Sequence, residues 1–551
     1  MSTKVVVIGG VAGGASAAAK ARRDDENAEI VMFEKGPYAS FANCGLPYFV
    51  GGTIEERGAL FQVSHSRFEN WFNIDLRVNH EVTKINRDKK QVEVINHITG
   101  EELSESYDKL IVATGGKPFT PPIPGIDSEH LFTLTTVPDA DDIMEKLEEE
   151  PETAVVIGAG FIGIESAEEL WRRGLDVTII EMADQILPPL DKEMTTPLME
   201  HLNEKGIKVL LGEEVVEIKQ SGKMGIRLKS GRELSTDFAI LATGIVPRVE
   251  LLKDADIDVS KTGVIVNEWM QTTDPDIYAA GDIVESPHMV TGEMVRIPLA
   301  GPANKQGRIA GAHAVGSRNK EFKGVLGTSI LKVLDLTAGS TGLNEKECKA
   351  KNIDYYSVYL PKGSWAGYFP GAETMMVKIL VDKMSGELLG AQVVGQKGVD
   401  KRVDIFATAL AANMTVEDLE DLDLAYAPPY SSAKGPAIMS GMIAADVFRG
   451  EMDIISPLDL KEKLENNEDI QLIDVRTEAE YKKGHIDQPI WIELDTLRDN
   501  LDRLDPEKYT VIYCKAGYRA YLAYKILKAN GFKRVDNLTG GILGWNLLSE
   551  K

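Results

Sequence analysis

Three cysteines, Cys44, Cys348 and Cys514, carry the most reactive side chains of this sequence. Their separations fit neither a disulfide framework nor a set of zinc ligands, so no metal site is expected and each thiol is judged by its surroundings. Cys44 lies in SFANCGLP, between turn-forming residues and a glycine, whereas Cys348 lies in LNEKECKAKN, a charged segment of helical composition. We therefore expect a reactive thiol at Cys44 and a structural or incidental one at Cys348.

Cys514 closes the apolar run TVIYC and opens a predicted helix through CKAGYR at 514–519. The backbone N–H groups of such a turn, together with a helix N-terminus, stabilise a thiolate and can hold a persulfide. Arg519 is expected to orient an anionic sulfur donor or to close the loop. Upstream, Asp474 and Arg476 are expected to form a structural ion pair beneath it.

Two glycine-rich turns each follow a short apolar run. The first, GGVAGG at 9–14, has the first and third glycines of a dinucleotide fingerprint but Val11 in the middle, and Glu34 ends the next apolar run. The second, GAGFIG at 158–163, is complete, and Glu181 ends its second strand. Such turns bring a pyrophosphate to a helix N-terminus, and the carboxylates can accept from ribose hydroxyls. Glu181 favours NADH, because a carboxylate repels a 2′-phosphate.

The elements that position these residues alternate in the βαβ manner. Residues 4–8 form a β-branched run followed by an Ala-rich stretch of helical composition, and the pattern returns at 154–170. LIVATGGKP at 110–118 and AILATGIVP at 239–247 close the two units. Alternating strands from about Gly324 and an Ala-rich helix near 404–413 indicate an α+β domain, and a compact unit with strands at QLIDV and TVIYC follows.

The expected fold is α/β, with two nested Rossmann-like nucleotide-binding domains, an α+β domain and a small C-terminal α/β domain. The expected bounds are 1–150 and 266–323 for the two parts of the first nucleotide-binding domain, 151–265 for the second, 324–448 for the α+β domain, 449–456 for a linker and 457–551 for the last domain.

Composition limits the partners. The chain has 551 residues, of which 43% are hydrophobic and 27% charged, and its formal net charge is -25. This acidic balance argues against a nucleic-acid partner, because phosphate binding needs a surplus of Lys and Arg. No segment approaches the roughly 18 uncharged apolar residues of a membrane span. The start MSTKVVVIGG has no cleavage site, so a cytoplasmic location is expected.

The segment TTDPDIYAAGD at 272–282, taken with the two fingerprints and the two ATG segments in their order, resembles the pyridine nucleotide-disulfide oxidoreductase family. The resemblance implies FAD in the first nucleotide site and NADH, with NADPH possible, in the second. The implied FAD-binding residues are Gly9, Gly10, Val11, Ala12, Gly14, Glu34, Lys35, Val82, Ala113, Thr114, Gly115, Gly281, Asp282 and Ala300. The implied NAD-binding residues are Gly158, Gly160, Phe161, Ile162, Gly163, Glu165, Glu181 and Gly244.

Family members with a Cys-x4-Cys pair carry their own disulfide, whereas Cys44 stands alone and must pair with an external sulfur or oxygen. This pattern resembles the single-cysteine branch, which contains coenzyme A-disulfide and coenzyme A-persulfide reductases, NADH oxidases and NADH peroxidases. The oxidases and peroxidases place a His where this sequence has Ala12, so thiol substrates are favoured. The segments AYAPPYSSAK and GYFPG resemble those whose tyrosines, here Tyr426 and Tyr368, reach the partner subunit's active site. A homodimer follows from the resemblance.

The resemblance also implies a coenzyme A site. An acidic protein needs local basic groups for the phosphates of this ligand, and three such groups end the first helix. For Arg22 and Arg23 the alternative is a solvated helix end that interacts with the helix dipole. The implied coenzyme A-binding residues are Ser16, Lys20, Arg22, Arg23, Ser40, Asn43, Tyr368, Tyr426 and Lys434.

The last unit resembles a single-domain rhodanese through LIDVRTEAEYKKGHI, CKAGYR and GGILGW, which makes Cys514 a sulfur carrier. The resemblances together imply an enzyme that reduces coenzyme A disulfide, or coenzyme A persulfide or polysulfide, with NAD(P)H and FAD through Cys44. They imply catalytic roles for Tyr368 and Tyr426, and sulfane-sulfur transfer at Cys514 with Arg519. The sequence leaves open an NADH oxidase or peroxidase, and a non-catalytic thiol redox sensor.

Overall fold

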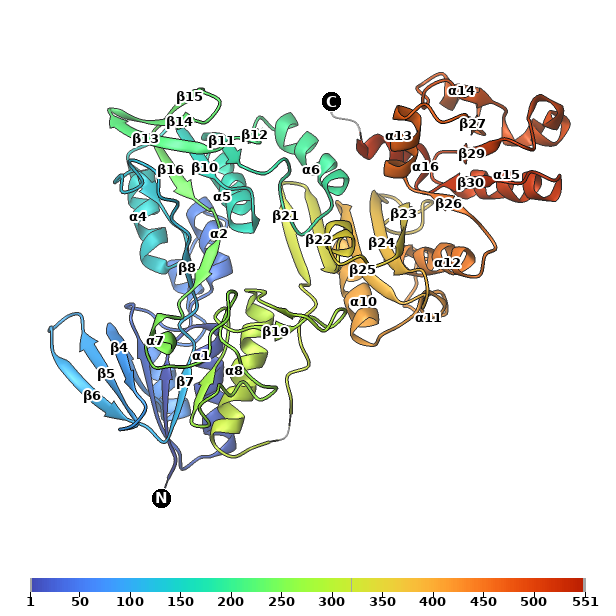
Figure 1. The fold of residues 1–551 in the computed structure, drawn as a ribbon. Helices are drawn as coiled ribbons and strands as arrows, with labels where there is room; N and C mark the ends of the chain where they lie inside the picture. Colours follow the sequence, from blue (N-terminus) through green and yellow to red (C-terminus); the bar gives the residue numbers. More distant parts are fainter. Residues whose placement is uncertain (1, 319, 549–551) are drawn as a thin grey trace. The chain divides into compact units, whose positions relative to one another are not determined.

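The computed structural model describes residues 2–318 and 320–548. The chain divides into two compact units, Met1–Asp184 with Gly206–Gly327 and Gln185–Lys205 with Thr328–Lys551. Figure 1 labels the main helices and strands of both units. Each unit is described by itself.

The first nucleotide-binding domain of unit 1 is built on a parallel sheet in the order β18-β7-β1-β2-β3. Val5 and Val7 enter the core on one face of this sheet and Val6 enters the core on the other, and all three are fully buried. Both faces are covered, as is usual for parallel sheets. The strands are β1 (Lys4–Ile8), β2 (Glu29–Glu34), β3 (Asp75–Val78), β7 (Lys109–Val112) and β18 (Ile277–Ala279).

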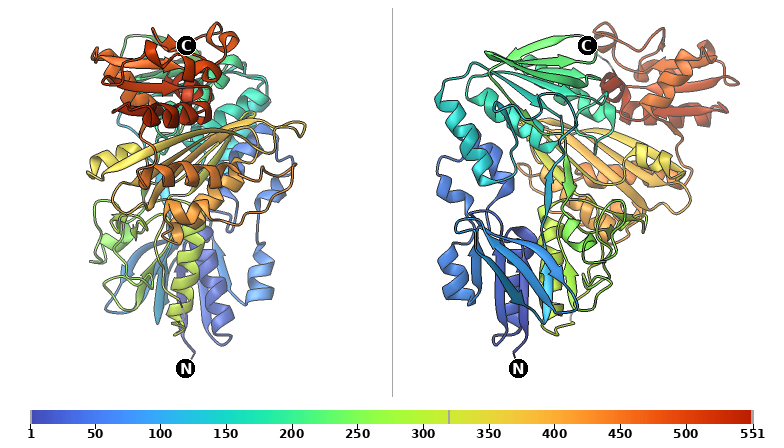
Figure 2. Two further views of the ribbon diagram at one scale, coloured as in Figure 1. Left: turned by 90° about the vertical axis from the view of Figure 1, so that its right-hand side faces the viewer. Right: turned by 60° about the vertical axis from the view of Figure 1, so that its left-hand side comes forward.

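Two helices of this domain, α1 (Ala12–Asp24) and α8 (Ala300–Ala314), lie side by side (Figure 2). A Cβ on Gly307 would come within 2.0 Å of the Gly13 carbonyl oxygen, and one on Gly311 within 2.1 Å of the Ala17 carbonyl oxygen. The backbones touch because these positions carry no side chain. This contact joins the first glycine-rich turn to a helix far downstream in the sequence.

The second nucleotide-binding domain repeats the design with a parallel sheet in the order β12-β11-β10-β16-β9. Its strands are β9 (Leu131–Phe132), β10 (Thr153–Ile157), β11 (Asp176–Glu181), β12 (Lys208–Leu211) and β16 (Phe238–Leu241), and its helices include α4 (Val137–Glu148) and α5 (Phe161–Arg172). The two similar ATG segments continue into β8 (Gly116–Pro118) and β17 (Ile245–Pro247), which pair antiparallel. The internal echo in the sequence thus corresponds to a direct pairing between the two domains.

Smaller elements complete unit 1. Two antiparallel meanders flank the nucleotide-binding sheets, and short helices and hairpins connect them (Figure 1). These elements are α2 (Leu46–Gly51), α3 (His65–Phe72), β4 (His80–Asn86), β5 (Gln91–Asn96), β6 (Glu102–Ser106), β13 (Val215–Ser221), β14 (Lys223–Leu228), β15 (Glu233–Thr236), α7 (Glu250–Lys253), β19 (Ser286–Pro287) and β20 (Met294–Val295).

Unit 2 begins with an antiparallel sheet in the order β21-β22-β25-β24-β23, packed with helices. Its strands are β21 (Ser329–Val333), β22 (Leu336–Gly342), β23 (Tyr355–Gly363), β24 (Thr374–Asp382) and β25 (Leu388–Gly395). Its helices are α6 (Lys192–Glu204), α9 (Glu345–Ala350), α10 (Val399–Ala411), α11 (Val416–Glu420) and α12 (Pro436–Phe448).

A buried ion cluster ties the segment 185–205 to this sheet. Lys378 in β24 is 0% exposed, and its Nζ lies 2.7 Å from Asp191, 2.5 Å from Glu193 and 3.1 Å from Glu345. The Tyr359 hydroxyl donates to the same Glu193 carboxylate at 2.7 Å. A buried ammonium group is tolerated only when paired in this way, which explains why this early segment belongs to the second unit.

The C-terminal part of unit 2 has a parallel sheet in the order β26-β30-β29-β27-β28, with apolar cores on both faces. Its strands are β26 (Ile454–Ile455), β27 (Ile470–Asp474), β28 (Ile490–Trp491), β29 (Tyr509–Tyr513) and β30 (Val535–Leu538). Its helices are α13 (Pro457–Glu465), α14 (Glu478–Tyr481), α15 (Tyr518–Ala529) and α16 (Gly541–Trp545).

The predicted fold class is confirmed. Strand β18 follows the whole second nucleotide-binding domain in sequence yet completes the sheet of the first domain, so the two are nested. The predicted Ala-rich helix near 404–413 corresponds to α10, which begins five residues earlier, at Val399. No helix of the described part of the chain combines the length and apolarity that crossing a membrane requires.

Candidate active sites

In the first glycine-rich turn, the backbone packs so closely that no side chain would fit at Gly9 or Gly14. Gly9 has a φ of 99°, and a Cβ there would lie 2.2 Å from the Ala113 carbonyl oxygen. A Cβ on Gly14 would lie 1.8 Å from the Gly9 carbonyl oxygen. These contacts hold strand β1, strand β7 and helix α1 together at one edge of the sheet, where nucleotides bind in folds of this kind.

Glu34, at the end of β2, lies beside this turn. Its carboxylate accepts from the backbone N–H of Gly10 at 2.7 Å and from that of Gly36 at 2.8 Å. Burial raises the pKa of Glu34, and the two N–H donors oppose this effect. The turn and the acidic residue predicted for one dinucleotide site are therefore in contact.

The structure places the other predicted FAD residues at several positions around this edge. Gly115 has a φ of 64° and open space where a Cβ would stand, and Gly281 has a φ of 84°. Burial raises the pKa of Asp282, and the Arg296 charge opposes this shift. The open edge, the small residues and the partly buried carboxylate fit a dinucleotide such as FAD.

Three further predicted FAD residues already have protein partners. Val82 is buried in the core beside a bulge of β4, so its backbone is the part left for a ligand. The Lys35 side chain forms an exposed ion pair with Glu81 at 2.8 Å. The Thr114 hydroxyl donates to the Arg248 carbonyl at 2.7 Å.

The second glycine-rich turn repeats this geometry and leaves more room. Cβ atoms on Gly158 and Gly163 would lie 2.3 Å from the Ala242 carbonyl oxygen and 2.0 Å from the Gly158 carbonyl oxygen, respectively. A Cβ on Gly160, in contrast, would meet nothing within 4 Å. The Glu181 carboxylate accepts from the backbone N–H groups of Ala159 at 2.7 Å and Ala183 at 2.8 Å. The space at Gly160 is where a pyrophosphate approaches in such turns.

Cys44 lies in a short 3-10 turn, Asn43–Gly45, immediately before α2, and its side chain is exposed. Partial withdrawal from water raises the pKa of the Cys44 thiol, and the negative charges of Glu165 and Asp282 raise it further. The chain thus brings a residue from each predicted nucleotide site within electrostatic reach of this sulfur.

Tyr48 is a site residue that the sequence did not reveal. Its hydroxyl donates to the Glu165 carboxylate at 3.0 Å. Burial, followed by the charges of Glu168 and Glu169, raises the pKa of Glu165 to about 7, and the Tyr48 hydrogen bond opposes the rise. Tyr48 follows Cys44 by four residues, the spacing of one helical turn, which is the only sequence signal for it.

The predicted coenzyme A residues on α1 separate into two groups. Ser16, Lys20 and Arg23 follow at i, i+4 and i+7 and so share a helix face. The Ser16 hydroxyl donates to Asn304 at 2.5 Å, and Lys20 pairs with Asp24.

Arg22, in contrast, is 4% exposed, and its guanidinium donates to the carbonyl oxygens of Glu26, Phe72 and Asn73 at 2.5, 2.7 and 2.8 Å. These contacts hold the end of α1 to the end of α3. The N–H groups of Arg22 are therefore already hydrogen-bonded to backbone carbonyls, and we leave this residue out of the coenzyme A site.

Ser40 precedes the Cys44 turn, and Asn43 begins it. Ser40 adopts a left-handed backbone, with a φ of 51°, and its N–H donates to the Gly10 carbonyl at 2.8 Å. The Asn43 side chain donates to the Thr135 carbonyl at 3.2 Å. The reactive turn is thereby anchored to the first glycine-rich turn and to the segment that leads into α4.

In unit 2, the hydroxyl groups of Tyr368 and Tyr426 lie 3.2 Å apart. Their side chains are 76% and 49% exposed. The hydrogen bond raises the pKa of Tyr368. Lys434 is exposed on the same loop as Tyr426. The two tyrosines predicted to act together are therefore a hydrogen-bonded pair at the surface of their unit.

The Cys514 sulfur lies at the start of a loop that ends in helix α15. The backbone N–H of Gly517 donates to Cys514 Sγ at 3.2 Å. Gly541 has a φ of 56°, and a Cβ there would come within 2.5 Å of the Cys514 carbonyl oxygen. Beneath the loop, the expected ion pair of Arg476 with Asp474 is present at 2.7 Å and buried.

Arg519 forms a bidentate ion pair with Glu480, and both N···O distances are 2.7 Å. The hydrogen bonds with Glu480 raise the pKa of Arg519, and Cys514 adds to this effect. Arg519 in turn lowers the pKa of Glu480 to about 2. The sequence did not single out Glu480, although the spacing of Thr477 and Glu480 is that of a helix capping box, which the structure contains.

Models of known families match three parts of the chain. The pyridine nucleotide-disulphide oxidoreductase family matches residues 3–307, the dimerisation domain of that family matches residues 328–438, and the rhodanese-like domain matches residues 456–548.

Individual relatives extend over most or all of the chain. The coenzyme A disulfide reductase of Staphylococcus haemolyticus is 35% identical over 446 residues, which are 81% of this chain and 100% of the relative. The crystal structure of reduced Bacillus anthracis CoADR-RHD has a TM-score of 0.96 and 45% identity, and covers 99% of this chain and 98% of its own. An NAD-dependent persulfide reductase from A. fulgidus has a TM-score of 0.91 and 41% identity, and covers 98% of this chain and 100% of its own. The chain therefore belongs to the pyridine nucleotide-disulphide oxidoreductase family and carries a rhodanese-like domain at its C-terminal end.

Proposed function

We propose that this protein uses NADH to reduce the S–S bond of coenzyme A disulfide or coenzyme A persulfide at Cys44, and that Cys514 carries sulfane sulfur. One observation carries the proposal: unit 1 contains a single cysteine, exposed in a turn within electrostatic reach of both nucleotide sites. Without a neighbouring thiol, the sulfur that pairs with Cys44 must come from the substrate. The names of the relatives indicate which substrates these are.

The cofactors follow from the family. The Gly9 turn, Glu34 and Asp282 would hold FAD, and the Gly158 turn and Glu181 would hold the nicotinamide nucleotide. A bound FAD supplies the path for two electrons between a nicotinamide hydride and a sulfur atom. We propose NADH over NADPH because the Glu181 carboxylate would repel a 2′-phosphate.

The chemistry of the chain itself is a thiol exchange. The Cys44 thiolate attacks one sulfur of coenzyme A disulfide, forms a mixed disulfide and releases one coenzyme A thiolate, which takes up a proton. Two electrons and one proton then return Cys44 to the thiolate and release the second coenzyme A as a thiol. With coenzyme A persulfide, the products are one thiol and hydrogen sulfide.

Several side chains support this exchange in the proposal. Ser16, Lys20, Arg23, Ser40, Asn43 and Lys434 would bind coenzyme A, the basic ones through its phosphates. Glu165, with a pKa of about 7, can hold or release a proton at neutral pH. In a homodimer, the Tyr368 and Tyr426 pair would reach the Cys44 of the partner subunit and donate a proton to the departing thiolate.

The C-terminal domain would supply or accept sulfur. The Gly517 N–H directed at Cys514 Sγ stabilises a sulfur anion, and Arg519, held by its ion pair with Glu480, would close the loop beside this sulfur. The cytoplasmic location expected from the sequence stays a prediction.

The proposal is tested by steady-state rates of NADH oxidation with coenzyme A disulfide, coenzyme A persulfide, polysulfide, hydrogen peroxide and oxygen. We expect rapid turnover with at least one coenzyme A substrate, loss of that turnover in Cys44→Ser, and normal turnover in Cys348→Ala, the control at a buried thiol. Faster turnover with peroxide or oxygen would assign an NADH oxidase or peroxidase instead. No turnover with any acceptor would favour a redox sensor.

A further inference from the structure

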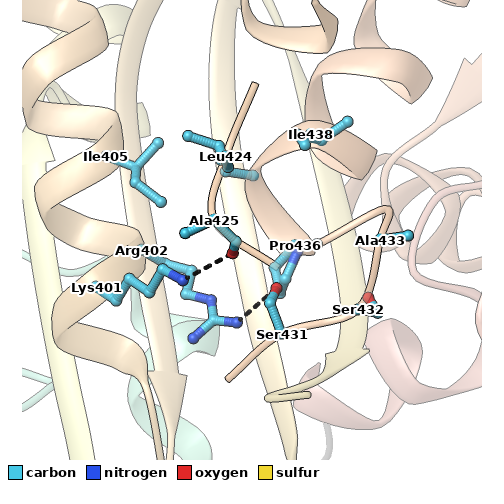
Figure 3. Close-up of a pocket in the computed structure, with 12 residues that line it drawn as sticks. Lys401, Arg402, Ile405, Leu424, Ala425, Ser431, Ser432, Ala433, Pro436 and Ile438 are labelled. Atoms are coloured by element: carbon cyan, nitrogen blue, oxygen red, sulfur yellow. Dashed lines mark hydrogen bonds between the residues drawn. The ribbon is translucent and has the colours of Figure 1, made fainter. Parts of the chain in front are cut away.

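Arg402, in helix α10, is buried and lines a small pocket together with Leu424 and Ala425, which directly precede Tyr426 in the sequence (Figure 3). Its Nη2 donates to the Ser364 carbonyl at 2.6 Å and lies 3.4 Å from the Ser431 hydroxyl, and its Nη1 donates to the Gly398 carbonyl at 3.0 Å. One guanidinium group therefore contacts the start of its own helix and two segments elsewhere in the chain.

Two of these segments lead to the tyrosine pair. Ser364 closes the base of the loop that carries Tyr368, because its N–H donates to the Glu373 carbonyl at 2.8 Å and its hydroxyl accepts from the Glu373 N–H at 3.1 Å. Ser431 lies five residues after Tyr426 on the second loop. Arg402 thus joins the bases of the two loops whose tips place the tyrosine hydroxyls 3.2 Å apart.

The charge of Arg402 is unusual for a buried residue whose only role is to fill space in the core. Arg402 is 2% exposed and forms no ion pair with any carboxylate among residues 2–318 and 320–548. Burial lowers the pKa of Arg402, and the charge of Asp400 opposes this shift only in part. A buried cation paired with neutral acceptors is costly, so its retention calls for a compensating role.

The backbone beside Arg402 is shaped around the guanidinium. Gly398, which precedes α10, has a φ of 72°, and a Cβ there would lie 2.3 Å from Arg402 Nη1. A side chain at this position would displace the guanidinium. The backbone at Gly398, the Arg402 guanidinium and the bases of the two loops therefore fit together closely.

We propose that Arg402 is a positioning residue that joins the two loops and so keeps the Tyr368 and Tyr426 hydroxyls within hydrogen-bond distance. The inference rests on the proposed role of these tyrosines in disulfide reduction. Arg402 itself touches no substrate in this account, and its whole effect on the reaction passes through the tyrosine pair.

A double-mutant cycle tests this inference in the full-length protein, with coenzyme A disulfide and NADH as substrates. The variants are Arg402→Met, Tyr368→Phe with Tyr426→Phe, and their combination. Lys401→Met is the matched control, because Lys401 is the preceding residue of α10 and its one hydrogen bond within residues 2–318 and 320–548 is a weak one to the Ala425 carbonyl, at 3.5 Å (Figure 3). FAD content and sulfur transfer at Cys514 report whether each variant is folded.

We expect Arg402→Met to lower kcat by at least about tenfold, which is less than the roughly 100-fold or more that loss of a proton donor costs, because the tyrosines themselves remain. Lys401→Met should leave kcat near wild type. The combined variant should be no slower than the tyrosine variant alone, because both changes remove the same function. Losses that multiply in the combined variant, or full activity in Arg402→Met, would overturn the inference. If the tyrosine variant itself is fully active, the proposed role of the tyrosines fails instead. If Arg402→Met does not fold, Ser431→Ala takes its place in the cycle, because it removes the contact between Ser431 and Arg402.

Discussion

The Cys44 thiol should become more reactive when the charge of Glu165 is removed. Glu165 raises the pKa of Cys44, and its own pKa is about 7, so Glu165 is mostly protonated at pH 6 and mostly ionised at pH 8. Glu165→Gln keeps the size of the side chain and abolishes this charge at every pH. The thiol should therefore differ from wild type at pH 8 and resemble it at pH 6.

The magnitude follows from the same pKa. Because each pKa unit corresponds to about 1.4 kcal/mol, the rise from 4.5 to about 7 means that ionising Glu165 costs about 3 kcal/mol more in the folded protein than in the unfolded chain. The folded state binds the extra proton, so its stability falls as the pH rises from 4.5 to 7, and Glu165→Gln should lack this loss. For Cys44, removal of the neighbouring Glu165 charge should lower the pKa of the thiol and so raise its thiolate fraction at any pH below that pKa.

The assay is the rate of alkylation by iodoacetamide at pH 6 and pH 8, with Cys514→Ser present in both proteins so that Cys44 is measured alone. Cys348 is fully buried and does not interfere. We expect Glu165→Gln to react faster than its parent at pH 8 and at an equal rate at pH 6. Equal rates at pH 8, or the same acceleration at both pH values, would refute the electrostatic link between these residues.

Three further outcomes are expected. Glu480→Gln should destabilise the C-terminal domain by roughly 1–2 kcal/mol at pH 7, after allowance for solvent screening. Near pH 3 the loss should be roughly half as large, because the stability that the lowered pKa contributes is lost as the pH falls from 4.5 to about 2. Hydrogen exchange of peptides from 457–548 measures this, and an equal loss at both pH values would contradict it. Cys514→Ser should abolish sulfur transfer from thiosulfate or polysulfide and spare reduction of coenzyme A disulfide, and loss of both activities would show that the two centres depend on each other. Mixed dimers of a Cys44→Ser subunit and a subunit with Tyr368→Phe and Tyr426→Phe should recover up to about half of wild-type activity, whereas no recovery after confirmed subunit exchange would exclude action across subunits.

Local patterns in the sequence were enough to predict the two glycine-rich turns and the acidic residue beside each. The spacing of Gly9 and Gly14 and the place of Glu34 after the next apolar run depend on one strand-turn-helix unit, and the structure brings them together. The same holds for Gly158, Gly163 and Glu181. The fingerprint works because adjacent parallel strands end at one edge of the sheet.

Contacts between segments far apart in sequence could not be predicted in this way. Glu165 meets Tyr48 across 117 residues, and Arg519 meets Glu480 across 39. The basic run at the end of the first helix suggested a ligand site. In the structure, however, Arg22 is buried and donates to backbone carbonyls 50 and 51 residues further along the chain, which only the folded arrangement reveals. Nothing in the sequence around Arg402 pointed to the tyrosine loops.

The central claim is that Cys44 exchanges with a coenzyme A sulfur and is restored by NADH. Mass spectrometry of peptides tests it most directly, after the thiol form of the FAD-loaded protein is mixed with coenzyme A disulfide and again after NADH is added. The account predicts one coenzyme A adduct on the Cys44 peptide, which disappears when NADH is added. An adduct confined to the Cys514 peptide, or a Cys44 adduct that NADH does not remove, would contradict it.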